Sequence, residues 1–230
     1  MKPLAIVTVL FDYPQYTMPS FYKNALRYGV NAEDIHIQRY NESFVGSYYD
    51  KLHYYKIAKT LEYLIGLADS YQHILFMDAL DTNFVKPIDE ILDVFSSYGK
   101  DIVTCAEQGL WPPTEANYLY ETKTVPSVYR YLNSGGIVGK TESVIKVLQR
   151  MPLLPGYDDQ GAWAVEYLTS DDICIDYDQH LFFSTYLSKN KVNIQDGNRV
   201  VIDSDAFIIH DNGPYGEDTI KLTEILNANH

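Results

Sequence analysis

The sequence predicts an α/β fold in which a mostly parallel central sheet is flanked by helices. Residues 4–11 (LAIVTVLF) form a continuous apolar, β-branched run of the kind found in central parallel strands. Further runs of this kind alternate along the chain with stretches of helical periodicity, which indicates parallel strands joined by helices. The 230 residues, 46% of them hydrophobic, are enough for one domain over residues 1–230 with a sizeable core, or for two small ones.

The first third of the chain contains two predicted helices and three predicted strands, which end at a pair of aspartates. The expected elements are a strand at 4–11, a helix opened by Pro19 and closed by Gly29, a strand at 34–40 (DIHIQRY), a helix over Tyr48–Ala68 and a strand at 73–77 (HILFM). The last of these strands stops directly before Asp78.

The rest of the chain continues the alternation around one long connection, 107–126, which is rich in Pro, Tyr and Glu. Long loops in compact domains are often lids or binding loops. The other expected elements are a helix from Pro87 through Phe95 that Gly99 ends, a strand at 101–106 (DIVTCA), a strand at 135–139 (GGIVG), a helix capped by Thr141 that runs through Arg150, a helix at 159–168, two short strands within 173–186 and 200–209, and a C-terminal helix.

Charge and composition disfavour several classes of protein. The net charge of −13 repels phosphate backbones, so a general nucleic-acid binder is not expected. Residues 4–11 are too short for a membrane span and lack a cleavage pattern after them, so we expect a cytoplasmic protein without a membrane partner. Cys105 and Cys174 are the only cysteines, and free buried thiols are expected. The 21 tyrosines suit carbohydrate and nucleobase surfaces as well as ordinary packing.

Asp78 and Asp81 follow a buried strand, at the edge where parallel sheets bind ligands. Hard oxygen ligands with few protein groups suit Mn²⁺ or Mg²⁺ that also holds substrate phosphates. Asp is also a common turn residue, and Asp81 could cap a turn for Thr82 and Asn83. The pair alone therefore leaves both interpretations open.

Five segments occur in a fixed order along the chain: FMDALD (76–81), TCAEQGLWPPTE (104–115), RYLNSGGIVG (130–139), YDDQ (157–160) and AFIIHDNGP (206–214). Together they resemble the glycosyltransferase domain of the procollagen-lysine hydroxylase family and its viral and bacterial relatives. The resemblance runs from VTVLF (7–11) to the C-terminal helix. It implies a GT-A fold, a nucleotide-sugar donor such as a UDP-sugar, and Mn²⁺-dependent transfer of the sugar to an acceptor hydroxyl.

The resemblance assigns roles to individual residues, each of which also has an ordinary structural explanation. It implies that Asp78, Asp81 and His210 are metal ligands and that the donor is bound by Thr8, Val9, Lys56, Asp78, Asn212 and Gly213. It places Asn133 at the sugar hydroxyls and makes Asp159 a sugar ligand or general base, with Asp158 as second choice. It places Glu107 and Trp111 at the acceptor or in a lid. The alternatives are a structural His, a packed Val9, a solvated Lys56, an Asn-Gly turn, and acidic residues that cap a helix.

Two positions depart from the family pattern. Leu80 replaces a tyrosine that stacks on the base, and residues 215–217 (YGE) replace a lysine of the animal enzymes that contacts the diphosphate. Lys221 could reach back to take that role. The animal enzymes also carry an iron and 2-oxoglutarate domain, for which a chain filled by the sugar-transfer domain leaves no room, so hydroxylation is not predicted.

Three other functions stay open from the sequence. The first is a glycosyltransferase that acts on a hydroxylated, for example hydroxymethylated, DNA base in phage, which the charge disfavours. The second is a metal-dependent phosphoester hydrolase, for which a denser Asp/His cluster and two metals are expected. The third is a non-catalytic module that binds a sugar nucleotide, which has less need for Asp78, Asp81 and His210 together.

Overall fold

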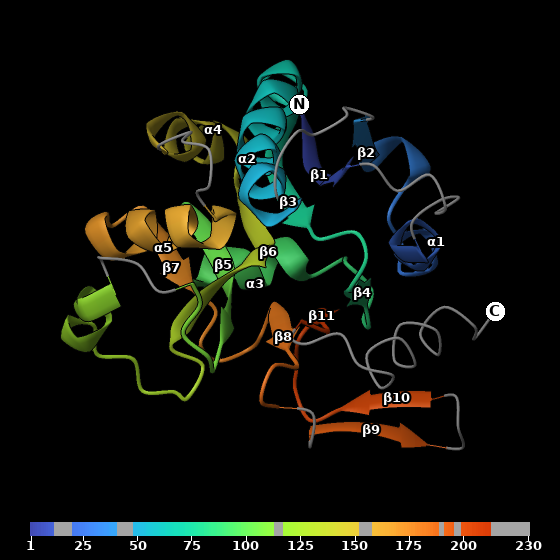
Figure 1. Cartoon of the computed structure of the whole chain (residues 1–230). Coiled ribbons are helices and arrows are strands. Elements are labelled where there is room, and N and C mark those ends of the chain that lie inside the picture. Colours follow the sequence, from blue (N-terminus) through green and yellow to red (C-terminus); the bar gives the residue numbers. More distant parts are fainter. Residues whose placement is uncertain are drawn as a thin grey trace.

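The computed structural model describes residues 1–11, 20–40, 48–112, 117–151, 158–188, 191–195 and 199–212. Its centre is a six-stranded sheet in the order β2-β1-β3-β6-β5-β7 (Figure 1). The strands are β1 (Lys2–Phe11), β2 (Ile35–Tyr40), β3 (Tyr71–Met77), β5 (Ile102–Glu107), β6 (Tyr131–Lys140) and β7 (Ile173–Ile175). Strand β6 runs antiparallel to β3 and β5, and the other three pairings are parallel. The predicted mainly parallel sheet is confirmed.

Helices cover both faces of this sheet. They are α1 (Ser20–Arg27), α2 (Tyr48–Leu67), α3 (Ile91–Ser97), α4 (Thr141–Arg150) and α5 (Asp159–Thr169), with short 3-10 helices at Ala32–Asp34 and Asn117–Thr122. Side chains alternate along each strand, so β1 contributes Val7 and Val9 to the core shared with α2, α4 and α5. Its Leu4 and Ile6 enter the core on the opposite face, which includes Ile91 and Phe95 of α3.

Two smaller sheets lie beside the central one (Figure 1). Strands β4 (Thr82–Phe84), β11 (Ile208–His210) and β8 (Phe182–Ser184) form a sheet in the order β4-β11-β8, and β9 (Val192–Gln195) forms a hairpin with β10 (Arg199–Ile202). Strand β11 runs antiparallel to β4 and places His210 opposite Thr82. This pairing brings the end of the described chain beside the end of β3.

Several predicted elements need correction. Lys140 is the N-cap of α4, and Thr141 is the first helical residue, whose Oγ1 donates to the Tyr71 carbonyl at 2.9 Å. Helix α3 begins at Ile91, four residues after Pro87, and β6 is ten residues long where five were expected. Strands β4 and β9 were not predicted, and the two short strands expected within 173–186 and 200–209 are in fact four, β7, β8, β10 and β11. The predicted C-terminal helix lies outside the described residues.

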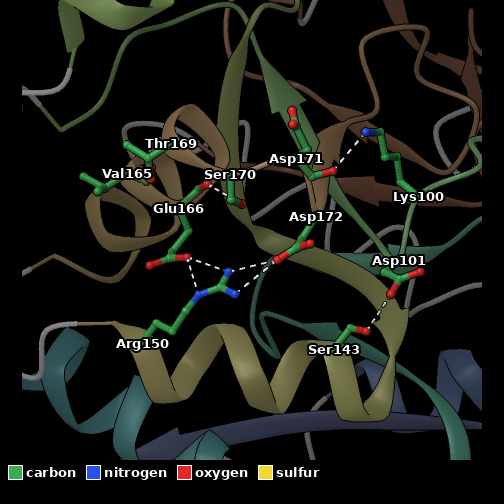
Figure 2. Close-up of polar contacts among 10 residues, drawn as sticks. All are labelled: Lys100, Asp101, Ser143, Arg150, Val165, Glu166, Thr169, Ser170, Asp171 and Asp172. Atoms are coloured by element: carbon green, nitrogen blue, oxygen red, sulfur yellow. Dashed lines mark hydrogen bonds and ion pairs between the residues drawn. The ribbon is translucent and has the colours of Figure 1, made fainter.

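A polar network joins α4 to α5 and to the segment that precedes β7 (Figure 2). The Arg150 guanidinium donates to one oxygen of Glu166 at 2.9 and 3.1 Å and to one oxygen of Asp172 at 3.1 Å from two nitrogens. At the start of α4, Ser143 Oγ donates to Asp101 Oδ2 at 2.8 Å. These contacts tie the end of α4 to α5 and to the segment before β7, and the start of α4 to the residue before β5.

Two further expectations concern cysteines and membranes. Both cysteines are free thiols, Cys105 buried and Cys174 partly buried. Within the described residues, no helix has the length and apolar character that a membrane crossing requires.

Candidate metal and nucleotide-sugar site

Asp78 and Asp81 lie on the turn between β3 and β4. The Asp78 N–H donates to the Gly135 carbonyl at 2.9 Å, and Thr82 Oγ1 donates to the Asp78 carbonyl, which closes the turn. Asp81 is buried, with 7% of its surface exposed. The segment therefore forms a turn, which Thr82 and Gly135 hold in place through the backbone of Asp78.

His210 faces these carboxyl groups from β11. Its Nε2 lies 3.4 Å from Asp81 Oδ2, and ligand atoms of Asp78, Asp81 and His210 all lie within 4.8 Å of one another. Burial alone would lower the pKa of His210, but the Asp81 and Asp78 carboxylates raise it overall. Burial likewise opposes ionisation of Asp81, yet the facing His210 holds its pKa below the usual value.

This cluster fits a divalent metal. Two carboxylates and one imidazole are donors that Mn²⁺ accepts, and the remaining positions would be left for substrate oxygens. The buried His210 Nδ1 has no hydrogen-bond partner among the described residues, an arrangement that costs free energy in a site without a ligand. Metal binding would replace the proton that the carboxylates favour on the imidazole.

Lys56 of α2 links the cluster to a third carboxylate. Its Nζ lies 2.7 Å from Asp78 Oδ1 and 2.9 Å from Asp159 Oδ2, and only 15% of its side chain is exposed. Burial would lower the pKa of Lys56, but Asp159 and Asp78 raise it above its usual value. The alternative of a solvated surface lysine is wrong.

The two acidic residues at the start of α5 have separate roles. Asp158 is the N-cap, and its Oδ1 accepts from the backbone N–H of Gln160 at 2.8 Å and of Gly161 at 3.3 Å. Asp159 is buried and its Oδ2 also accepts from Ser134 Oγ at 2.9 Å. The structure thus brings Asp159, and not Asp158, to Lys56.

Glu107 was expected in the long loop. It is instead the last residue of β5 and is 3% exposed. Its Oε1 accepts from Gln160 Nε2 at 2.6 Å and its Oε2 from Asn212 Nδ2 at 2.7 Å. Burial raises the pKa of Glu107, and these donors and His210 oppose the rise. The Trp111 carbonyl accepts from the same Gln160 Nε2 at 2.8 Å.

Trp111 itself is 61% exposed beside this network, which is compatible with a role at the acceptor or in a lid. Glu107 and Gln160 thereby connect the start of the long loop, the start of α5 and the residues after β11. Gln160 and Ser134 were not singled out from the sequence, although both stand inside the YDDQ and LNSGG segments.

The remaining expected donor residues are less connected to the cluster. Thr8 is fully buried in β1, and its Oγ1 lacks a hydrogen-bond partner among the described residues. Val9 packs in the core, as its structural alternative predicted. Asn133 is buried, and its Oδ1 accepts from the Gly135 N–H at 2.9 Å. Gly213 and Lys221 lie outside the described residues.

Comparison with known proteins supports the resemblance seen in the sequence. The sequence model of the family described as PLOD GT domain matches residues 49–228. The chain is 30% identical over 154 residues to the procollagen-lysine,2-oxoglutarate 5-dioxygenase of Drosophila melanogaster, which covers 61% of the chain and 21% of that protein. It is 26% identical over 152 residues to the human multifunctional procollagen lysine hydroxylase and glycosyltransferase LH3, which covers 61% of the chain and 20% of that protein. The chain thus spans about a fifth of the length of these relatives.

Among solved structures, the fold is similar to that of a glycosyltransferase involved in the glycosylation of the major capsid of PBCV-1. The TM-score is 0.59 at 14% identity, over 96% of this chain and 99% of that one. The shared fold, the ordered sequence segments and a family match over most of the chain agree. This chain belongs to the PLOD GT domain family of glycosyltransferases.

Proposed function

We propose that this protein is a metal-dependent glycosyltransferase that moves a sugar from a UDP-sugar to a hydroxyl of an acceptor such as hydroxylysine, a glycan or another hydroxylated molecule. The observation that carries the proposal is the gathering of Asp78, Asp81 and His210 within 4.8 Å, beside the Lys56–Asp159 ion pair. A sugar leaves its nucleotide as positive charge builds on the ring, so the departing diphosphate must be stabilised.

The donor side of the site would be built around the cluster. Asp78, Asp81 and His210 would hold Mn²⁺ or Mg²⁺, which acts as a Lewis acid on the diphosphate of the donor. Lys56 adds a buried positive charge directly beside Asp78. Asn212 and Gly213 follow His210, where backbone N–H groups beside a glycine can approach a phosphate closely. Thr8 and Val9 stay candidates for the base and ribose.

The acceptor side would be built around Asp159. This carboxylate is positioned by Lys56 and by Ser134, and it would either hold a sugar hydroxyl or take the proton of the acceptor hydroxyl. Glu107 would orient Asn212 and Gln160 at the same edge, and the exposed Trp111 would offer an aromatic face to an acceptor. Asn133 stays a candidate for contact with the sugar hydroxyls, and its Oδ1 also accepts from the Gly135 N–H.

The proposal covers residues 1–230 as one transferase domain. The family match to residues 49–228 supports this extent, and β1 adds the strand next to β3 in the central sheet. The described residues contain one cluster that could hold a metal, which supports transfer over the two-metal phosphoester hydrolase considered from the sequence. The cytoplasmic location expected from the sequence stays a prediction.

A panel of nucleotide sugars tests the proposal. Each donor is incubated with Mn²⁺ or with a chelator, and release of nucleoside diphosphate is measured in the wild type and in Asp81→Ala. We expect release from a uridine donor that needs both Mn²⁺ and Asp81. Stabilisation by guanosine or cytidine nucleotides but not by uridine ones in a thermal-shift assay would overturn the donor assignment. Equal release with chelator and Mn²⁺ would overturn the metal requirement.

A further inference from the structure

Strand β6 contains a bulge at its contact with β5. Thr104 of β5 pairs with Ile137, but the next residue, Cys105, pairs with Asn133, so residues 134–136 oppose no residue of β5. On the other side of β6, Met77 of β3 still pairs with Gly136. Bulges re-aim the chain and are frequent near active sites. On the β3 side the pairing continues past the Met77–Gly136 pair, because the Asp78 N–H donates to the Gly135 carbonyl at 2.9 Å.

Gly135, at the middle of the bulge, is held on both sides. Its N–H donates to Asn133 Oδ1 at 2.9 Å, and its carbonyl accepts from Asp78. Its φ is not positive, in contrast to Gly29 and Gly99, so its backbone conformation does not require glycine. The requirement has to come from the space around the residue.

The space that a side chain at position 135 would need is filled by the His210 ring. A Cβ built on Gly135 would lie 2.1 Å from Cε1, 2.6 Å from Nε2 and 2.7 Å from Nδ1 of that ring, all under the 3.0 Å that real Cβ contacts respect. The backbone of His210 is paired with both β4 and β8, so strand β11 cannot easily shift to relieve this contact. A methyl group at position 135 would therefore have to turn the imidazole away or push the bulge outward.

We propose that Gly135 is the positioning residue that sets the two halves of the cluster against each other. Its carbonyl fixes the backbone of Asp78, and its missing side chain admits the His210 ring next to Asp81. Asp78 and His210 are 132 residues apart in the sequence, and Gly135 contacts both. The steric part of this inference stands on the packing alone, whereas its consequence for metal binding rests on the proposed function.

Gly135→Ala tests the inference, with Gly136→Ala as the matched control. A Cβ on Gly136 would lie 2.6 Å from the ring of Phe182, so the control introduces a comparable clash one residue away, but against the core and not against His210. We expect both variants to melt at lower temperature than the wild type. We expect Mn²⁺ affinity to fall about 10- to 100-fold in Gly135→Ala, as for other residues that orient metal ligands, and to stay within a few-fold in Gly136→Ala.

Double variants separate the steric contact from any other effect. In the His210→Ala background, where the ring is absent, Gly135→Ala should lower the melting temperature little, whereas Gly136→Ala should lower it as much as before. Additive losses for Gly135→Ala and His210→Ala would overturn the inference, as would unchanged Mn²⁺ affinity in Gly135→Ala when the wild type binds Mn²⁺.

Two further outcomes are also decisive. If Gly135→Ala alone does not fold, folding of the double variant Gly135→Ala/His210→Ala supports the inference, and failure of the double variant while His210→Ala folds overturns it. If the wild type binds no Mn²⁺, the proposed function fails, and the melting temperatures of the double variants still decide whether Gly135 makes room for His210.

Discussion

Asp158 and Asp159 show at the scale of single residues why neighbouring acids can have different roles. Both stand where a helix N-terminus favours negative charge, and only the family resemblance ranked Asp159 ahead of Asp158 for the site. In the structure Asp158 accepts from two backbone N–H groups of α5, whereas Asp159 contacts Lys56 and Ser134. Asp158 therefore caps the helix, and Asp159 contacts residues of the candidate site.

Replacement of Asp158 by Ala should act on stability. The change removes the acceptor for the N–H groups of Gln160 and Gly161, and loss of such a cap costs about 1 kcal/mol of unfolding free energy. Chemical denaturation measures this cost, and calorimetry with Mn²⁺ and a uridine nucleotide should show unchanged affinity. A large loss of nucleotide affinity without loss of stability would contradict the cap assignment.

Replacement of Asp159 by Asn should act on turnover. If Asp159 takes the proton of the acceptor, the transfer rate should fall by about 10²- to 10⁴-fold, the usual contribution of a general base. Donor and Mn²⁺ affinity should change little, since the amide keeps the size of the side chain and Asp78 still contacts Lys56. Steady-state rates and nucleotide binding are compared on the same preparation, and a full transfer rate would exclude Asp159 as the base.

At the scale of secondary-structure elements, side chains that bridge elements fix the sheet and its helices in place. His36 of β2 contacts the hydroxyl of Tyr63 in α2 at 2.8 Å and that of Tyr71 in β3 at 3.1 Å. The Tyr71 hydroxyl donates to Asp34 or to the Glu33 carbonyl, so it accepts from His36 Nε2, and Nδ1 is left to accept from Tyr63. A neutral imidazole satisfies all of these contacts.

The stability of the β2–α2–β3 contact should therefore depend on pH. Burial lowers the pKa of His36 in the folded protein, so the unfolded chain binds a proton first as pH falls. The wild type should keep this contribution above about pH 6.5, the ordinary value for His, and lose it as pH drops toward the folded pKa. Chemical denaturation at pH 7.5 and at pH 5 should show that the unfolding free energy falls more in the wild type than in His36→Gln. The reverse order would mean that folding raises the pKa of His36.

The Arg150 network joins three elements on the surface (Figure 2). Its side chain is 45% exposed, so the ion pairs with Glu166 and Asp172 are screened by solvent. Arg150→Ala should cost about 1 kcal/mol of unfolding free energy. Arg150→Lys, which keeps the charge but loses the fork of donors, should recover only part of it. Nucleotide binding is the control and should not change in either variant.

At the scale of the whole molecule, local sequence patterns predicted most strands and helices of the fold, whereas the candidate site is formed by contacts between residues far apart in the sequence. Continuous apolar runs identified β1, β3 and β5, because strands buried on both faces need such runs. The antiparallel direction of β6 has no local signal, and Thr82–Phe84 resembles a turn because three residues are too few to show a strand period.

Some features of the candidate site could likewise be predicted from the sequence, and others could not. Asp78, Asp81 and His210 were predicted from motifs that resemble a family, since nothing local connects the two aspartates with a histidine near the other end of the chain. The buried position of Lys56 was not predictable, because a lysine on a helix is usually solvated and only α5 supplies its second partner. The bulge in β6 likewise depends on the register of two neighbouring strands.

The cluster joins two distant parts of the chain, so metal binding should stabilise the whole fold. Asp78 and Asp81 follow β3, and His210 ends β11, which is held by β4 and β8. The unfolded chain holds these ligands far apart, so Mn²⁺ should bind the folded state and stabilise it by about 2.7 kcal/mol at a concentration 100 times the dissociation constant. We expect Mn²⁺ to raise the melting temperature of the wild type and a chelator to reverse the rise.

Asp78→Ala and Asp81→Ala should fold but show neither the rise nor Mn²⁺-dependent nucleotide binding, whereas Asp158→Ala should show both. Calorimetry with undiminished metal-dependent binding in both aspartate variants would place the metal elsewhere.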